Sequence, residues 1–202
     1  MPPNLIQPYA LGFRNPEGSW DVGDDLHDLN TTNLQRGVLF PYNHSVGIYP
    51  CPSDKTTVTD RPTFPWARTY QWDDLLNCSY DGGPPPWFPD SRWMKRRSSQ
   101  LVDPSPTGIL PFADDITALS GGDASFVLKL KPPTDADEWS SLPGEQHGRA
   151  GNLAFADGHA EHFRWRWSRA NYPANLISYG LKGADDRNDF QRVKDCFPKP
   201  SS

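Results

Sequence analysis

The sequence predicts an α+β domain built on an antiparallel β-sheet, with long proline- and glycine-rich loops and few short helices. Three observations lead to this fold class. The chain of 202 residues contains 22 prolines and 16 glycines, and proline at about twice its average share breaks long helices. It also contains 8 tryptophans, 7 tyrosines and 10 phenylalanines, which supply the large apolar groups of a core. Finally, short alternating segments are joined by turn sequences, as is typical of antiparallel strands.

The N-terminal half is expected to be irregular, with short elements. Residues 1–29 are rich in turn sequences. The segment 31–37 predicts one or two helical turns, because a threonine can cap its start and a glycine can end it. Pro41-Tyr42 then favours an extended conformation for the chain after this helix. Residues 46–49 are interpreted as a short strand that two prolines stop, and 68–76 as a strand or short helix.

The C-terminal half shows clearer strand signals. Residues 108–112 predict a buried strand entered by a turn, and 125–130 predict another. Residues 151–156 and 159–167 predict a hairpin around Asp157-Gly158, because both of these residues tolerate a positive φ. Alternation in the return strand places three aromatic side chains on one face and three basic or imidazole side chains on the other: Phe163, Trp165 and Trp167 against His162, Arg164 and Arg166.

The end of the chain shows weak structural signals. The helical pattern is weak beyond residue 170, and residues 196–200 read as a tail. The acidic run at 185–189 is loosely similar to a calcium-binding loop, but it lacks the glycine and terminal glutamate of an EF-hand. Because no internal repeat is visible, we interpret residues 1–202 as a single globular domain.

The charge balance argues against two classes of partner. The net charge of −5 and the isoelectric point near 5.5 differ from the basic footprint of a nucleic-acid-binding protein. The basic run at 95–97 is short and is interpreted as a solvated loop. No stretch approaches the roughly 20 apolar residues of a membrane span, and the first residues show no leader pattern. We therefore expect no nucleic-acid partner and no direct membrane span.

Four sequence blocks carry a resemblance to a known family. They are G-V-L-F-P-Y with Y-P-C-P-S-D inside 37–54, R-T-Y at 68–70, D-P-S-P-T followed by Asp114-Asp115 inside 103–115, and a histidine separated by nine residues from Asp-Gly inside 146–159. In this order they resemble the prepilin-type, processing-associated H-x(9)-D-G proteins, which are related to type II secretion pseudopilins. The resemblance covers 30–167 as a family-like core, between the irregular segment 1–29 and a C-terminal extension, 168–202.

The resemblance implies a fold, a location and a function. The fold would be similar to a pseudopilin head. The function would be that of a non-enzymatic structural subunit outside the cytoplasm, which self-associates or joins other pilin-like subunits in a bacterial filament or secretion pseudopilus. Such proteins begin with a leader and a long apolar helix, whereas this sequence has neither. Without that helix, we expect any assembly to rely on the head domain or on another chain.

Two groups of residues are candidate metal ligands. Asp114, Asp115 and Asp123 could bind Ca²⁺, which takes 6–8 oxygen ligands; the alternative, which we favour for this group, is a solvated acidic loop. His147, Asp157 and His159 could bind a metal in a hydrolase, with Asp157 and His159 on one strand face. The alternative, which we favour for the second group, is a structural turn at Asp157 and a hydrogen-bonded His147.

Aromatic and cysteine residues leave two further questions open. Five tryptophans could form a carbohydrate-binding platform in a secreted module, but we favour a role in the core: Trp87, Trp93, Trp139, Trp165 and Trp167. Cys51 and Cys78 could form a disulfide that leaves Cys196 unpaired, or all three could be free thiols. The sequence does not decide between these states.

Overall fold

The structure is a computed structural model, and it describes residues 31–37, 39–58, 61–73, 75–76, 93–95, 97–115, 125–126, 128–129, 137–139, 141–171 and 179–200. Its centre is a five-stranded sheet in the order β5 (Ser125–Phe126), β3 (Tyr70–Asp73), β4 (Phe112–Asp114), β8 (Ala150–Ala154) and β9 (Ala160–Arg164). All neighbours in this sheet pair antiparallel except β3 and β5, which pair parallel. The predicted α+β class with antiparallel sheets is confirmed at this coarse level.

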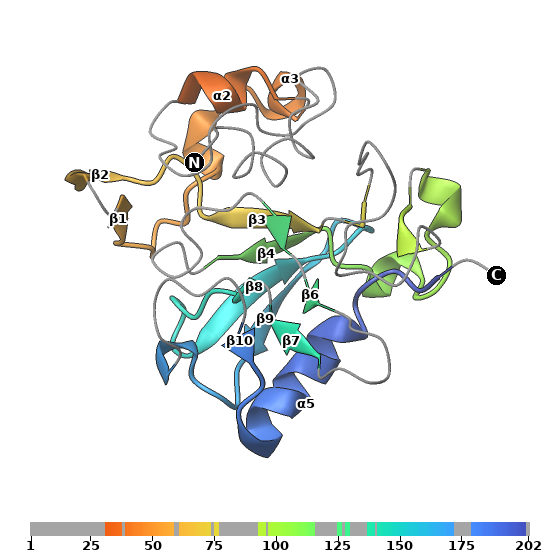
Figure 1. Cartoon of the computed structure of the whole chain (residues 1–202). Coiled ribbons are helices and arrows are strands. Elements are labelled where there is room, and N and C mark those ends of the chain that lie inside the picture. Colours follow the sequence, from red (N-terminus) through yellow and green to blue (C-terminus); the bar gives the residue numbers. More distant parts are fainter. Residues whose placement is uncertain are drawn as a thin grey trace, which may run out of the picture.

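Two smaller sheets flank the central one (Figure 1). β1 (Thr57–Val58) pairs antiparallel with β2 (Arg61–Pro65). β7 (Glu138–Trp139) lies between β10 (Tyr179–Gly180) and β6 (Leu128–Lys129), and all three are antiparallel. The strand predicted at 125–130 is therefore divided between two sheets, because β5 joins the central sheet and β6 joins β7.

Short helices dominate the described N-terminal part, and two predictions there are wrong. α2 (Thr31–Gln35) forms as expected, but the predicted extended exit is α3 (Phe40–Asn43), with proline in its first turn. The fixed φ of proline suits that position. The predicted strand at 46–49 is the 3-10 helix η2 (Val46–Ile48). The Asn43 side chain donates to the Leu39 carbonyl and to the Tyr49 hydroxyl, and so holds this compact arrangement.

The predicted hairpin is confirmed. β8 and β9 pair over five residues, from Ala150 opposite Arg164 to Ala154 opposite Ala160. Gly158 takes a φ of 95°, and Asp157 accepts the backbone N–H of His159 across the turn. The alternation also holds, because Phe163 and Trp165 are buried and Trp167 is half-buried, whereas the basic and imidazole side chains between them are exposed.

Helix α5 (Gly183–Lys194) is the main element that the sequence did not predict. Its buried face carries Asp186 and Asp189 beside Phe190 and Val193, so the face that packs against the domain is half acidic. The two carboxylates pair with the fully buried Arg169 of η6 (Arg169–Asn171). The loosely calcium-like run at 185–189 is therefore helical, and two of its aspartates bind an internal arginine instead of a loop cation.

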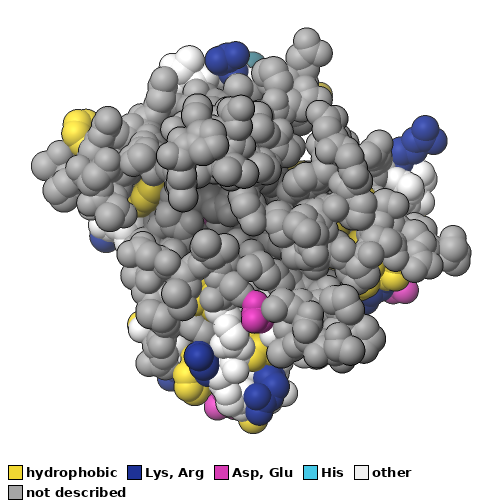
Figure 2. Space-filling model, viewed as in Figure 1, with side chains coloured by type: hydrophobic (Ala, Val, Ile, Leu, Met, Phe, Trp, Pro, Cys, Tyr) yellow, Lys and Arg dark blue, Asp and Glu magenta, His cyan; other side chains and the backbone are white. Residues whose placement is uncertain are grey.

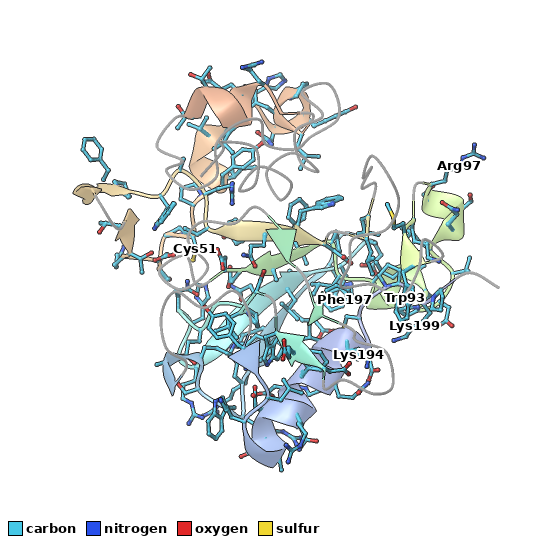
Figure 3. The ribbon with its side chains drawn as sticks, in the orientation of Figure 1. Cys51, Trp93, Arg97, Lys194, Phe197 and Lys199 are labelled. Atoms are coloured by element: carbon cyan, nitrogen blue, oxygen red, sulfur yellow. The ribbon has the colours of Figure 1, made fainter. Side chains whose placement is uncertain are left out.

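The prediction that residues 196–200 form a tail is also wrong. Phe197 is fully buried, and the Cys196 carbonyl accepts the backbone N–H of Leu110. Lys199 donates its backbone N–H to the Asp103 carbonyl. Figure 3 shows Phe197 close to Trp93, at the opposite end of the sheet from Cys51. The C-terminal residues thus complete the hydrophobic core.

The core lies between one face of the central sheet and the covering layer of α5, β7 and β10. It contains Leu153 and Phe163 from the hairpin and Trp139, Tyr179 and Phe190 from the cover. The Arg169 guanidinium lies 4.7 Å from the ring centroids of both Trp139 and Trp165, so aromatic faces line the buried cation. The remaining described helices are η4 (Ser98–Gln100) and η5 (Pro106–Gly108).

Within the described ranges, no helix combines the length and apolar character that crossing a membrane requires. On the face seen in Figure 2, the described lysine and arginine side chains lie at several separate places. This face therefore shows no single basic patch among the side chains that the structure describes.

Candidate functional site

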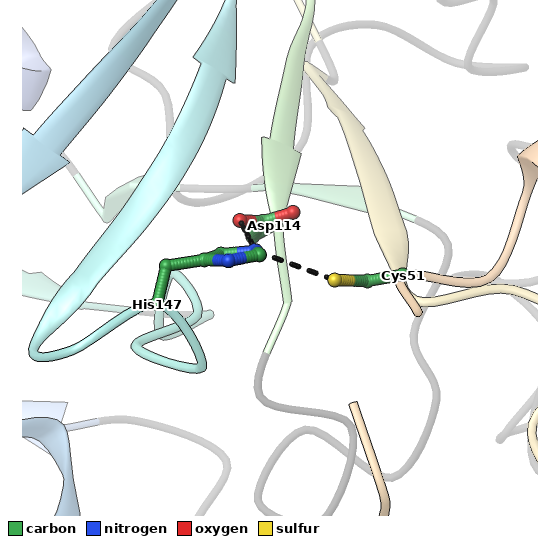
Figure 4. A group of neighbouring side chains, drawn as sticks. All are labelled: Cys51, Asp114 and His147. Atoms are coloured by element: carbon green, nitrogen blue, oxygen red, sulfur yellow. Dashed lines mark hydrogen bonds and ion pairs between the residues drawn. The ribbon is translucent and has the colours of Figure 1, made fainter. Parts of the chain in front are cut away.

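Three side chains from distant parts of the chain meet on the sheet face opposite the core (Figure 4). His147 Nε2 lies 3.3 Å from Cys51 Sγ and 3.3 Å from Asp114 Oδ2. The sulfur, the nitrogen and a carboxylate oxygen all lie within 4.8 Å of one another. Among the residues that the structure describes, this is the one group of His, Cys, Asp or Glu side chains arranged closely enough to hold a metal ion.

The site stands on a polar row that crosses four strands. Tyr70 on β3 lies opposite Asp114 on β4, and Asn152 on β8 lies opposite His162 on β9. The Asn152 backbone N–H donates to Asp114 Oδ2 at 2.6 Å, which joins the two halves of the row. Because side chains alternate along a strand, Ala113 and Leu153 enter the core while these polar neighbours face the other way.

Cys51 is positioned by Thr69, just before β3. The Cys51 backbone N–H donates to Thr69 Oγ1 at 2.5 Å, and Thr69 donates its own N–H to the Tyr49 carbonyl at 3.1 Å. The Thr69 carbonyl in turn accepts the Asp115 N–H at 2.9 Å. A single threonine therefore attaches the Cys51 segment to the end of β4, where Asp114 lies.

His147 is held by a loop that lies directly on β4. The Gly144 N–H donates to the Asp114 carbonyl at 2.6 Å, and the Gly144 carbonyl accepts Trp165 Nε1–H at 2.7 Å. A Cβ on Gly144 would lie 2.8 Å from the Asp114 Cβ, so only glycine permits this approach. The loop therefore brings His147 directly over the Asp114 carboxylate.

Further contacts fix the two ends of the His147 loop. Glu145 accepts the backbone N–H groups of Arg169 and Ala170, at 2.8 and 3.1 Å. After His147, Gly148 and Arg149 take φ values of 68° and 64°, a left-handed pair that turns the chain into β8. The Arg149 carbonyl accepts the Trp165 N–H, which secures this turn against the hairpin.

The carboxylate at the centre of the site is deeply buried. The Asp114 side chain is 1% exposed, and its Oδ1 has no hydrogen-bond partner. Burial raises the pKa of Asp114 above its usual value, although the Asn152 N–H and the neighbouring His147 act in the opposite direction.

Tyr70 lies on the same side of the site. Burial, followed by the negative charges of Asp114 and Cys51, raises the pKa of Tyr70 to about 12. Its phenol therefore stays protonated at neutral pH and remains a hydrogen-bond donor beside the carboxylate and the thiol.

The candidate metal group of His147, Asp157 and His159, for which a structural turn was the favoured alternative, is not assembled. His147 precedes β8, whereas Asp157 and His159 lie at the turn that joins β8 to β9, so the length of the hairpin separates them. Asp157 Oδ1 instead contacts His159 Nδ1 at 2.5 Å, and His159 Nε2 lies 3.5 Å from Glu161. This exposed pair belongs to the turn.

The structure describes only part of the candidate Ca²⁺ site formed by Asp114, Asp115 and Asp123. Asp114 and Asp115 are consecutive at the end of β4, so their side chains leave the chain in opposite directions. Asp114 meets Cys51 and His147, which are not the oxygen donors that Ca²⁺ prefers. Asp123 lies outside the described residues.

The structure also bears on the state of the cysteines and on the role of the tryptophans. Cys51 and Cys196 are free thiols, and Cys78, the partner considered for Cys51, lies outside the described residues. Trp139 and Trp165 are buried, which removes both from an exposed glycan platform. Trp93 and Trp167 are half-buried and pack against the core, and Trp87 lies outside the described residues.

Sequence reasoning selected Asp114 and His147 but assigned them to separate sites, and it did not select Cys51 as a ligand. The available signal was the family-like blocks, because each of the three residues lies in a different block. Comparisons of the chain with models of protein families, with curated proteins and with solved structures found no match.

Proposed function

We propose that the chain is the globular head of a pilin-like or pseudopilin-like subunit. It is a structural protein that acts outside the cytoplasm and assembles with copies of itself or with related subunits. One observation carries the proposal: all four family-like blocks contribute to the same cluster. The first block supplies Cys51, the second Thr69 and Tyr70, the third Asp114 and the fourth His147. The blocks therefore act as parts of one structural unit, which supports the resemblance as a likeness in fold.

The burial of this unit favours a structural role over catalysis. Cys51 is 4% exposed, so its thiol offers little access to a substrate. A Cys-His-Asp relay also needs the histidine to contact the thiol through one ring nitrogen and the carboxylate through the other. Here both contacts involve Nε2 of His147. The cluster suits an internal link between three segments better than an activated nucleophile.

Assembly needs an outward surface, and the short N-terminal helices offer one. Tyr42 on α3 is 87% exposed and Ile48 on η2 is 56% exposed, six residues further along the same compact segment. Large apolar side chains that stay exposed in a folded domain gain free energy when a partner covers them. The occupant we propose is a second copy of the chain.

The test is the association state of the purified chain. We expect sedimentation velocity to show association that increases with protein concentration, and we expect Tyr42→Ser combined with Ile48→Ser to weaken it. Val102→Ser is the matched control, because Val102 is 75% exposed but lies in another part of the chain. A chain that stays monomeric at every concentration, or a control that weakens association equally, would refute this surface. Turnover of ester or glycan substrates would refute the non-enzymatic role.

A further inference from the structure

We propose that Cys51, Asp114 and His147 form a binding site for one transition-metal ion, with Zn²⁺ as the best match. The inference does not depend on assembly. In a tetrahedral site, zinc lies about 2.3 Å from sulfur and about 2.0–2.1 Å from nitrogen or oxygen, which separates its ligand atoms by about 3.3–3.6 Å. The two contacts of His147 Nε2 are each 3.3 Å, and the third pair of ligand atoms lies within 4.8 Å. A small adjustment of one side chain completes the geometry.

Hydrogen bonds alone do not account for the arrangement. One ring nitrogen, Nε2 of His147, faces both the Cys51 sulfur and the Asp114 carboxylate. If Nε2 carries a hydrogen, that single hydrogen can make a well-aligned bond to only one of the two acceptors. If it carries none, its lone pair faces the carboxylate lone pairs. A cation between the three atoms accepts a lone pair from each of them and removes this conflict.

The Asp114 carboxylate gives a second, independent observation. Its Oδ2 already accepts the Asn152 N–H, while its buried Oδ1 has no hydrogen-bond partner. Burying a charged oxygen without a partner is costly, because nothing replaces the water it has lost. In Figure 4 the carboxylate lies beside the gap between the imidazole and the thiol, so an ion in that gap would compensate the buried charge.

The donor set selects the class of ion. Thiolate and imidazole are ligands for Zn²⁺ and related transition metals, whereas Ca²⁺ binds through oxygen. The site offers three protein ligands, and the His147 side chain is 23% exposed. Solvent can therefore reach the histidine side of the site and supply a fourth ligand. A bound ion would link the Cys51 segment, β4 and the loop before β8, and so stabilise the folded chain.

The experiment is a titration of the metal-free full chain with Co²⁺, followed by competition with Zn²⁺ and with Ca²⁺. Cobalt reports a thiolate ligand through sulfur-to-metal charge-transfer absorption. We expect one Co²⁺ per chain with this absorption, displaced by Zn²⁺ and unaffected by Ca²⁺. Cys51→Ser is expected to abolish the charge-transfer band. His147→Gln should weaken binding more than about 100-fold, since losing groups that only support metal ligands already costs 10–100-fold.

Two control variants separate this site from other ligands. Cys196→Ser changes the other described free thiol, and His159→Gln changes the imidazole at the hairpin turn. Both are expected to leave the cobalt spectrum unchanged. If Cys51→Ser fails to fold, alkylation of the wild-type chain replaces it: Zn²⁺ should slow modification of Cys51 and leave Cys196 unaffected. Absence of stoichiometric binding, displacement by Ca²⁺, or a band that survives Cys51→Ser and disappears in Cys196→Ser would overturn the proposal.

Discussion

Gly144 and Gly151 are in direct backbone contact: a Cβ built on Gly151 would lie 2.6 Å from the Gly144 carbonyl oxygen. That carbonyl also accepts the Trp165 indole N–H, so it cannot move away without breaking this bond. The absence of a side chain at one strand position therefore determines how closely the His147 loop approaches the sheet.

Gly151→Ala should therefore destabilise the domain by about 1–3 kcal/mol, the usual cost of forcing an extra methyl group into a packed site. Urea unfolding followed by tryptophan fluorescence measures the change. Gly180→Ala is the matched control, because a Cβ on Gly180, also in a strand, meets no atom within 4 Å. Equal effects of the two substitutions would contradict the steric explanation.

Arg169→Met should destabilise the domain by about 3–5 kcal/mol, because it leaves the buried Asp186 carboxylate without its cation and leaves Asp189 with Arg192 alone. Arg169 Nη1 lies 2.9 Å from Asp186 Oδ1, and Nη2 lies 3.2 Å from Asp189 Oδ2. Thermal unfolding by circular dichroism measures the loss. Arg187→Met serves as the control, since this arginine lies on the exposed side of α5 and its removal should change stability by less than about 0.5 kcal/mol.

The free energy of unfolding of Asp73→Asn should increasingly exceed that of the wild-type chain as the pH rises above the ordinary pKa of an aspartate. Asp73 is fully buried; its Oδ1 accepts the Leu75 N–H, but its Oδ2 has no hydrogen-bond partner. Burial raises the pKa of Asp73 well above its ordinary value, and the Leu75 N–H only partly offsets this.

The sign of this pH dependence follows from proton linkage. The folded chain holds the Asp73 proton more tightly than the unfolded chain, so wild-type stability falls as the pH rises from the unfolded pKa towards the folded pKa. The asparagine cannot ionise and lacks this loss. Urea unfolding of both proteins across that pH range measures the difference. Asp195→Asn, at a carboxyl that is 63% exposed, is the control. A constant difference between wild type and Asp73→Asn would disprove the assignment.

The Asp157–His159 pair should be visible in an NMR titration of the histidines. The hydrogen bond that His159 donates to the Asp157 carboxylate raises the pKa of His159 above 6.5, and desolvation opposes this only in part. The stabilisation from a charged His159 is therefore present at acidic pH and is lost as the pH rises through the raised pKa. Asp157→Asn should lower that pKa more than Glu161→Gln, because Glu161 contributes less. The reverse order would rule out the turn contact as the main cause.

The elements that could be predicted from sequence are those whose signals are local. The β8–β9 hairpin follows from alternating side chains around Asp157-Gly158, and both signals lie within a few residues. The 3-10 helix at Val46–Ile48 was misread because β-branched residues beside a tyrosine favour a strand. Tyr49, directly after this 3-10 helix, is buried against Leu34 of α2, and such packing overrides the local propensity.

Helix α5 and the candidate site depend on contacts that no local pattern shows. Half of the buried face of α5 is acidic, and these buried carboxylates are explained by the ion pairs that they form with Arg169. Cys51 meets a histidine 96 residues later in the chain. Asp114 and His147 could be identified from sequence as polar residues in family-like blocks. Their contact with each other and with Cys51 could not, because it depends on the sheet and on the backbone contact of Gly144 with Asp114.

The position of α5 after every strand of the central sheet has a consequence for biosynthesis. Ribosomes deliver the chain from its N-terminus, so the central sheet is complete before Phe190, Val193 and Phe197 leave the exit tunnel. Until then the sheet lacks part of its apolar cover, and Arg169 lacks both carboxylates. Folding of this domain therefore finishes only after α5 and Phe197 have emerged, and until then the nascent chain exposes apolar surface that chaperones recognise.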